Sequence, residues 1–156
     1  RDDCSSRGLG DVYKSQLNEG IFQGATINTP SMLCVADYLD ALDWVEGLGG
    51  VEATIKKSEE NLRVVESFVN QRPWINFLAR VSDQRSNTSV CLTLDTEPFK
   101  VSEITKLLAD EGVAYDIGAY RDAPAGLRIW CGATVAQSDL EALMPWIEWA
   151  FDTVNK

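Results

Sequence analysis

The order of helical and strand-like segments is the feature that most restricts the fold of this chain. Four segments carry apolar residues at the helical period: residues 30–46, 51–70, 100–111 and 138–151. Pro73 ends the second of them, and four short runs have strand character: residues 74–80, 88–94, 113–117 and 127–131. Strands grouped between helices, with short connections, favour an α+β fold in which helices cover one face of a mostly antiparallel sheet.

Capping signals locate two of the helix starts. Thr29 is the expected N-cap of the first helix, with Pro30 at the first helical position, where its missing N–H costs nothing. The run from Ser138 to Glu141 has the pattern of a capping box for the last helix.

In the second helix one face is expected to be buried, formed by Val51, Ile55, Leu62, Val65 and Val69.

Charge and missing residue types exclude several functions. With 14 basic and 24 acidic residues the net charge is −10, which disfavours nucleic acid or an anionic membrane as a partner. The chain has no histidine, so Ser-His-Asp or Cys-His catalysis and His-ligated metal sites are excluded, and no metal site is expected. No CxxC motif occurs, and the cysteines are expected to be buried free thiols of a reducing, cytoplasmic environment: Cys4, Cys34, Cys91 and Cys131.

The first 16 residues differ from the rest of the chain. They have a loop-like Ser and Gly content and no sustained apolar period, so we expect a poorly anchored leader over residues 1–16. Two origins fit this composition. One is a natural linker from an upstream domain, and the other is non-native sequence of the kind that sequencing adapters produce when translated.

Two places combine residue types suited to binding an anion. Asn28 and Thr29 precede a helix, where free N–H groups and the helix dipole attract negative charge, although plain capping explains them as well. Arg128 lies in a predicted strand whose alternation sets it on the face opposite Leu127 and Ile129. The arginine fork suits a bound carboxylate, and a structural ion pair is the alternative.

Four stretches of the sequence resemble the C-terminal part of phosphoserine aminotransferases: GIFQGATINTPSMLCVADYLDALDW, RSNTSVCLTL, GVAYDIGAYRDAPAGLRIWCGATV and DLEALMPWIEWAF. These enzymes are class V, fold-type I aminotransferases that use pyridoxal 5′-phosphate. The resemblance extends over about residues 17–156. It implies that residues 17–50 end the large cofactor-binding domain and begin the linking helix, and that residues 51–156 form the small C-terminal domain of a cytoplasmic homodimer.

The resemblance also implies roles for particular residues. Asn28 and Thr29 match a pair that reaches across the dimer interface to the phosphate of the neighbouring subunit's cofactor. Arg128 matches the arginine that binds the substrate carboxylate, and Arg121 matches a basic loop that faces the substrate phosphate. That loop differs from the better-known pattern by one residue in spacing, and Tyr120 replaces a histidine. The Schiff-base lysine lies upstream in the family, so no catalytic residue is expected in this chain.

The implied reaction transfers an amino group from L-glutamate to 3-phosphohydroxypyruvate, giving O-phospho-L-serine and 2-oxoglutarate in serine biosynthesis and in pyridoxine biosynthesis. The chain alone is expected to be inactive. One alternative is a class V aminotransferase of the alanine/serine–glyoxylate type, and another is a non-enzymatic α+β binding module. A stand-alone module predicts covered apolar surfaces, whereas a piece of the enzyme predicts an exposed apolar face between Met32 and Glu46.

Overall fold

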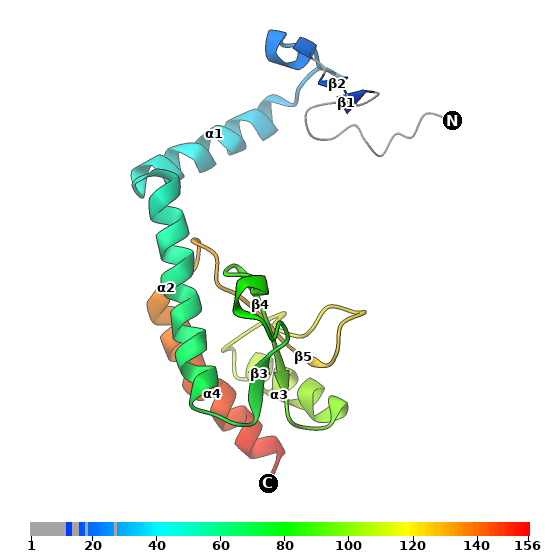
Figure 1. Ribbon diagram of the computed structural model, residues 1–156, viewed down its shortest axis with the longest axis vertical. Helices are drawn as coiled ribbons and strands as arrows, with labels where there is room; N and C mark the ends of the chain where they lie inside the picture. The colour runs from blue at the N-terminus through cyan, green and yellow to red at the C-terminus, as the bar shows by residue number, and fades with distance from the viewer. Residues whose placement is uncertain (1–11, 14–15, 18, 27) are drawn as a thin grey trace, which may run out of the picture. The chain divides into compact units, whose positions relative to one another are not determined.

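The computed structural model describes residues 12–13, 16–17, 19–26 and 28–156, which fall into two compact units, 1–44 and 45–156. In the first unit two short strands pair antiparallel and are followed by a 3-10 helix and an α-helix (Figure 1). These elements are β1 (Val12–Tyr13), β2 (Gln16–Leu17), η2 (Glu19–Gln23) and α1 (Met32–Gly47), whose last residues belong to the second unit. Most of the predicted leader lies outside the described residues.

The second unit is an antiparallel sheet of three strands, in the order β3-β4-β5, with three α-helices packed against it (Figure 1). Its elements are α2 (Gly50–Asn70), β3 (Ile75–Phe77), η3 (Ser82–Gln84), β4 (Ser89–Leu94), α3 (Pro98–Asp110), β5 (Gly126–Trp130) and α4 (Gln137–Val154). Helix α2 contacts β3, α3 contacts β5, and α4 contacts both helices. The predicted α+β fold is confirmed.

One core lies between the sheet and these helices. Alternate strand residues face it, and the register places Val90 opposite Ile129 and Leu92 opposite Leu127. The side chains that are completely inaccessible to solvent are mostly aliphatic: Val65, Ile75, Ile104, Leu108, Cys131, Ile147, Ala150 and the polar Asn61. Burial raises the pKa of the Cys131 thiol to about 12, so this thiol stays neutral.

The predicted strand over residues 113–117 is wrong. This segment approaches β5 through an isolated bridge between Gly118 and Leu127, and the N–H of Arg128 donates to the Ile117 carbonyl at 2.7 Å. Asp116 has a φ of +52°, a left-handed conformation that interrupts an extended backbone. The segment is therefore an irregular edge beside β5 rather than a strand.

Both predicted caps are also wrong. Helix α1 begins at Met32, and the Oγ of Ser31, not Thr29, accepts a hydrogen bond from the N–H of Cys34 at 3.4 Å. Helix α4 begins one residue early, after Ala136, and no side chain caps this start. Glu141 instead accepts a hydrogen bond from the side chain of Gln137, one helical turn before it, at 2.7 Å.

The buried face of α2 differs in part from the prediction. Val51 and Ile55 are 61% and 50% exposed, whereas Asn61 is fully buried. Its Nδ2 donates to the carbonyls of Cys131 and Val135, both at 3.1 Å, and lies 3.3 Å from the Gly132 carbonyl. This amide holds the chain where it leaves β5.

The cysteines do not all follow the prediction of buried thiols. Cys131 is buried and Cys91 is half-buried, but Cys34 is exposed on α1. Cys4 lies outside the described residues. None of the residues of α1 is buried, so this helix leaves its cysteine in solvent, whatever the apolar character of the surrounding sequence.

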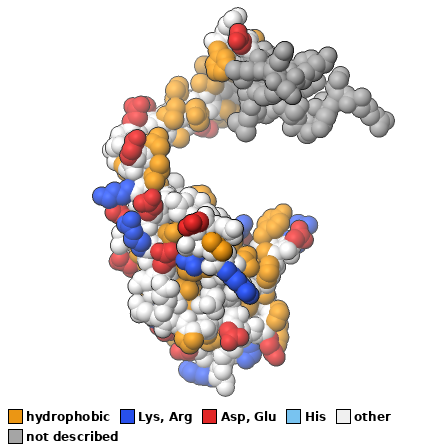
Figure 2. Space-filling view, in the orientation of Figure 1, with side chains coloured by type: hydrophobic (Ala, Val, Ile, Leu, Met, Phe, Trp, Pro, Cys, Tyr) orange, Lys and Arg blue, Asp and Glu red, His pale blue; other side chains and the backbone are white. Residues whose placement is uncertain are grey.

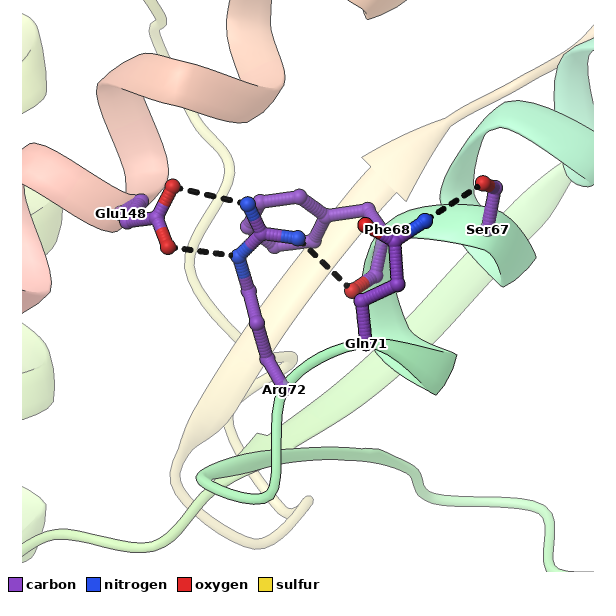
Figure 3. A network of polar contacts seen from close by, with 5 residues as sticks. All are labelled: Ser67, Phe68, Gln71, Arg72 and Glu148. Carbon is purple, nitrogen blue, oxygen red and sulfur yellow. Dashed lines mark hydrogen bonds and ion pairs between the residues drawn. The ribbon is translucent and has the colours of Figure 1, made fainter.

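A charged pair ties the end of α2 to α4. Nε and Nη2 of Arg72 each lie 2.8 Å from a carboxylate oxygen of Glu148, and Nη1 donates to the Phe68 carbonyl (Figure 3). The guanidinium also covers the ring of Phe68 at 3.9 Å. This arrangement lowers the pKa of Glu148, mainly through its hydrogen bond with Arg72.

Candidate functional site

Arg128 lies on the face of the sheet that the helices leave open. In β5 the side chains of Leu127 and Ile129 are buried, Arg128 is half-buried and Trp130 is exposed, as the alternation predicts. The ladder pairs Arg128 with Cys91 of β4, the central strand. The backbone of Arg128 is thus fixed from both sides, by β4 and by Ile117.

Asp116 is the residue that pairs with the Arg128 guanidinium. Its Oδ2 lies 3.4 Å from Nη2, and its side chain is 93% exposed. Ion pairs in such contact with water contribute about 0–1 kcal/mol. No other hydrogen bond or ion pair involves this guanidinium among the described residues. A carboxylate ligand can therefore replace Asp116 with little loss of free energy and accept two parallel hydrogen bonds from the Arg128 guanidinium.

Arg121 occupies a turn that precedes β5. The N–H of Ala123 donates to the Tyr120 carbonyl at 2.9 Å, and the N–H of Ala119 donates to Gly126 at the start of β5. Arg121 is exposed and pairs with no acidic side chain of the described residues. Its pocket of about 360 Å³ is lined partly by the loop and partly by the first half of α3, whose members are Pro98, Val101, Ser102 and Thr105. Arg128 does not line this pocket.

Asn28 and Thr29 lie in the first unit, just before α1, so their geometry is described within that unit. Both are exposed, and the Asn28 carbonyl accepts a hydrogen bond from the Thr26 hydroxyl at 2.7 Å. The first turn of α1 contains no acidic residue. Side-chain amide and hydroxyl donors beside the unpaired N–H groups of a helix start are a donor set that fits a phosphate group.

Sequence reasoning missed Asp116, which pairs with Arg128, and Asn61, which holds the chain just after β5. Asp116 carried one usable signal, because Asp tolerates positive φ better than most residues. Nothing in the sequence indicated that Asn61 is buried, since an amide in a charged amphipathic helix is normally exposed.

Within the described part of the chain, no three His, Cys, Asp or Glu side chains are grouped so as to hold a metal ion. None of the helices described there is long and apolar enough to cross a membrane.

No family model matches the sequence. The chain is 55% identical over 140 residues to phosphoserine aminotransferase of Methanosarcina mazei and 53% identical to that of Methanosarcina barkeri. Each match covers 90% of this chain and 38% of the relative, so the chain spans well under half of their length. A putative phosphoserine aminotransferase of Mycobacterium leprae is 26% identical over 133 residues.

Solved structures show the same fold at lower identity. A phosphoserine aminotransferase from Bacillus circulans subsp. alkalophilus superposes with a TM-score of 0.76 at 20% identity, over 85% of this chain and 36% of that one. A second, titled as radiation damage of the Schiff base in phosphoserine aminotransferase, gives 0.75 at 21% identity. The four α-helices and three-stranded sheet of the described residues thus match part of these structures. By sequence and by fold, this chain is related to the C-terminal portion of phosphoserine aminotransferase.

Proposed function

We propose that this chain is the C-terminal part of a phosphoserine aminotransferase that moves an amino group from L-glutamate to 3-phosphohydroxypyruvate. The observation that carries the proposal is Arg128, a half-buried arginine on the open face of the sheet whose partner is an almost fully exposed aspartate. The similarity to Methanosarcina phosphoserine aminotransferase supports the choice of reaction.

The cofactor of this reaction is pyridoxal 5′-phosphate, which when bound withdraws electrons from the substrate α-carbon. Asn28 and Thr29 would hold its phosphate, together with the N–H groups at the start of α1, because this donor set fits a phosphate. The resemblance places that phosphate in the neighbouring subunit of a homodimer. By the resemblance, the lysine of the large domain would move the proton at the substrate α-carbon, so we propose no residue of this chain for that step.

Arg128 would hold the α-carboxylate, a group shared by the amino donor and the oxo-acid acceptor. A bidentate contact fixes orientation as well as charge, and the β4 and Ile117 backbones keep Arg128 in place. Arg121, exposed and without an acidic partner in the described chain, would attract the substrate phosphate. A cytoplasmic location is part of the same proposal, because the resemblance is to a cytoplasmic enzyme family.

The stand-alone binding module is the less favoured alternative. That reading requires apolar surfaces to be covered, but none of the residues of α1 is buried. An aminotransferase of the alanine/serine–glyoxylate type would keep Arg128 and need no site for a substrate phosphate. The substrate assay below distinguishes this second alternative.

The test is a chimera of Methanosarcina mazei phosphoserine aminotransferase that carries the matching 140 residues of this chain. We expect amino transfer from L-glutamate to 3-phosphohydroxypyruvate, with much weaker activity on pyruvate and glyoxylate. Arg128→Lys should slow both half-reactions about tenfold or more, a loss of roughly 1.4 kcal/mol, because lysine cannot form the bidentate contact. Arg63→Lys, on the exposed side of α2, is the matched control.

The second arm separates cofactor binding from substrate binding. Replacing both Asn28 and Thr29 by Ala should weaken cofactor binding more than substrate binding, while Arg128→Lys leaves cofactor affinity unchanged. A folded chimera that prefers glyoxylate would reject the phosphoserine assignment. If Arg128→Lys only lowers the melting temperature, Arg128 has a structural role and the site assignment is wrong.

A further inference from the structure

Two exposed tryptophans of α4 form a corner that the proposed aminotransferase chemistry does not use. Trp146 and Trp149 are 40% and 39% exposed, their ring centroids are 5.3 Å apart, and their planes cross at 86°. Together with Pro145 and Glu111 they line a pocket of about 410 Å³. This volume lies within the usual range of small-molecule sites.

The charges around this corner are negative. Glu111 is the C-cap residue of α3, so the carbonyl end of that helix and its negative dipole lie beside the carboxylate. The last turn of α3 contains no basic residue, and neither does α4. Among the described residues no Lys or Arg lines the pocket, and no ion pair involves Glu111. The pocket therefore lacks a cation of its own.

Aromatic faces and negative charge together select one class of ligand. An organic ammonium ion is attracted by the electron-rich face of an indole, more strongly than by other aromatic rings, and also by a carboxylate. A metal ion such as Mg²⁺ or Ca²⁺ requires several oxygen ligands, and the pocket lining has one carboxylate side chain. An anion would meet Glu111 and the end of α3.

We propose that Trp146, Trp149 and Glu111 form a binding site for a small organic ammonium ion, quaternary or methylated. The two rings provide perpendicular apolar walls, and Glu111 with the end of α3 supplies the opposite charge. The site belongs wholly to the second unit, and Arg128 and Arg121 do not line it. It is therefore independent of the proposed carboxylate and phosphate contacts.

The test follows the indole N–H signals of the full chain by NMR, with choline chloride as the probe and sodium chloride at the same ionic strength as reference. The chain has five tryptophans, so single Trp→Phe variants assign five signals. We expect choline to shift those of Trp146 and Trp149 in a saturable way, with a dissociation constant on the order of millimolar. Trp74, which stacks on Phe151, serves as an internal control.

Two comparisons make the result decisive. The neutral isostere 3,3-dimethyl-1-butanol should shift these signals little, because it has the shape of choline without the charge. Glu111→Gln should weaken choline binding about fivefold or more, whereas Glu103→Gln, an exposed carboxylate elsewhere on α3, should leave it unchanged. Equal binding of the isostere, an unchanged Glu111→Gln variant or no saturable shift with choline would each overturn the proposal.

Discussion

Two consecutive helices of this chain show how little apolar content alone decides burial. Helix α2 is strongly charged, yet it buries Ser58, Asn61, Val65, Phe68 and Val69. Helix α1 carries a larger share of apolar residues and buries none of them. Orange hydrophobic side chains gather along this helix in Figure 2. The large apolar side chains of α1 that are exposed are Met32, Leu33, Val35, Tyr38, Leu39, Leu42 and Trp44.

The difference lies in the packing partners. Helix α2 has the sheet and α4 to pack against, so its few apolar residues find a core. An apolar surface as extensive as that of α1 is typical of an interaction site rather than of a free protein surface. The exposed face predicted between Met32 and Glu46 is confirmed, and it agrees with a chain that spans 38% of its relatives' length.

The largest expected effect tests this contrast with two matched aliphatic truncations. Ile147 is completely buried in α4, so Ile147→Ala should cost about 2–5 kcal/mol of unfolding free energy. Leu39 of α1 is 54% exposed, and Leu39→Ala should change the same quantity by less than about 0.5 kcal/mol. Urea unfolding of the full chain, followed by circular dichroism, measures both. Equal losses would mean that α1 is packed as well as α4.

A smaller effect is expected from the buried amide of α2. Asn61→Ala removes the donors to three carbonyls beyond β5 and leaves those of Cys131 and Gly132 buried, which should cost about 1–3 kcal/mol. Asn70→Ala, the same change at the exposed end of α2, should have little effect. Hydrogen exchange of the Cys131 amide, bonded to the Thr88 carbonyl, should accelerate in the first variant only. Similar unfolding energies for the two variants would show that Asn61 is not an anchor.

Sequence periodicity was sufficient to locate the helices of the second unit and the strands β3, β4 and β5, because their apolar residues face one shared core. It failed at 113–117, where Ala114 and Ile117 are buried although the backbone turns at Asp116. Residues that are buried in a backbone without regular hydrogen bonding do not recur at a fixed spacing, so periodicity does not predict how that segment folds. The same limit explains why Val51 and Ile55 were wrongly expected to be buried: periodicity defines a face, not what covers it.

In the candidate site too, periodicity predicted what lies in a regular strand and missed what lies in an irregular segment. The orientation of Arg128 followed from strand alternation, and the structure confirms it. Its partner Asp116 lies in an irregular segment and could not be identified by any period. Asn28 and Thr29 keep their position before a helix, but the cap is Ser31, so their side chains are not needed for capping. The binding roles of Arg128, Arg121, Asn28 and Thr29 remain predictions from the resemblance.

The smallest expected effect concerns the Arg72–Glu148 pair, which joins α2 to α4 beside the core. Glu148 is 42% exposed, so water weakens the pair, and Glu148→Gln should cost less than about 1 kcal/mol at neutral pH. Asp152→Asn, at an exposed position of the same helix, is the control for loss of a carboxylate.

The pH dependence of this effect has a definite sign. The hydrogen bond from Arg72 lowers the pKa of Glu148 in the folded chain, so the pair stabilises the fold above the unfolded pKa of about 4.3 and is lost as pH falls through the folded value. In urea, wild type should therefore have a larger free energy of unfolding than Glu148→Gln at pH 7. This difference in unfolding free energy should vanish in acid and decrease in high salt. A difference that persists in acid would assign the stabilisation to packing over Phe68 rather than to charge.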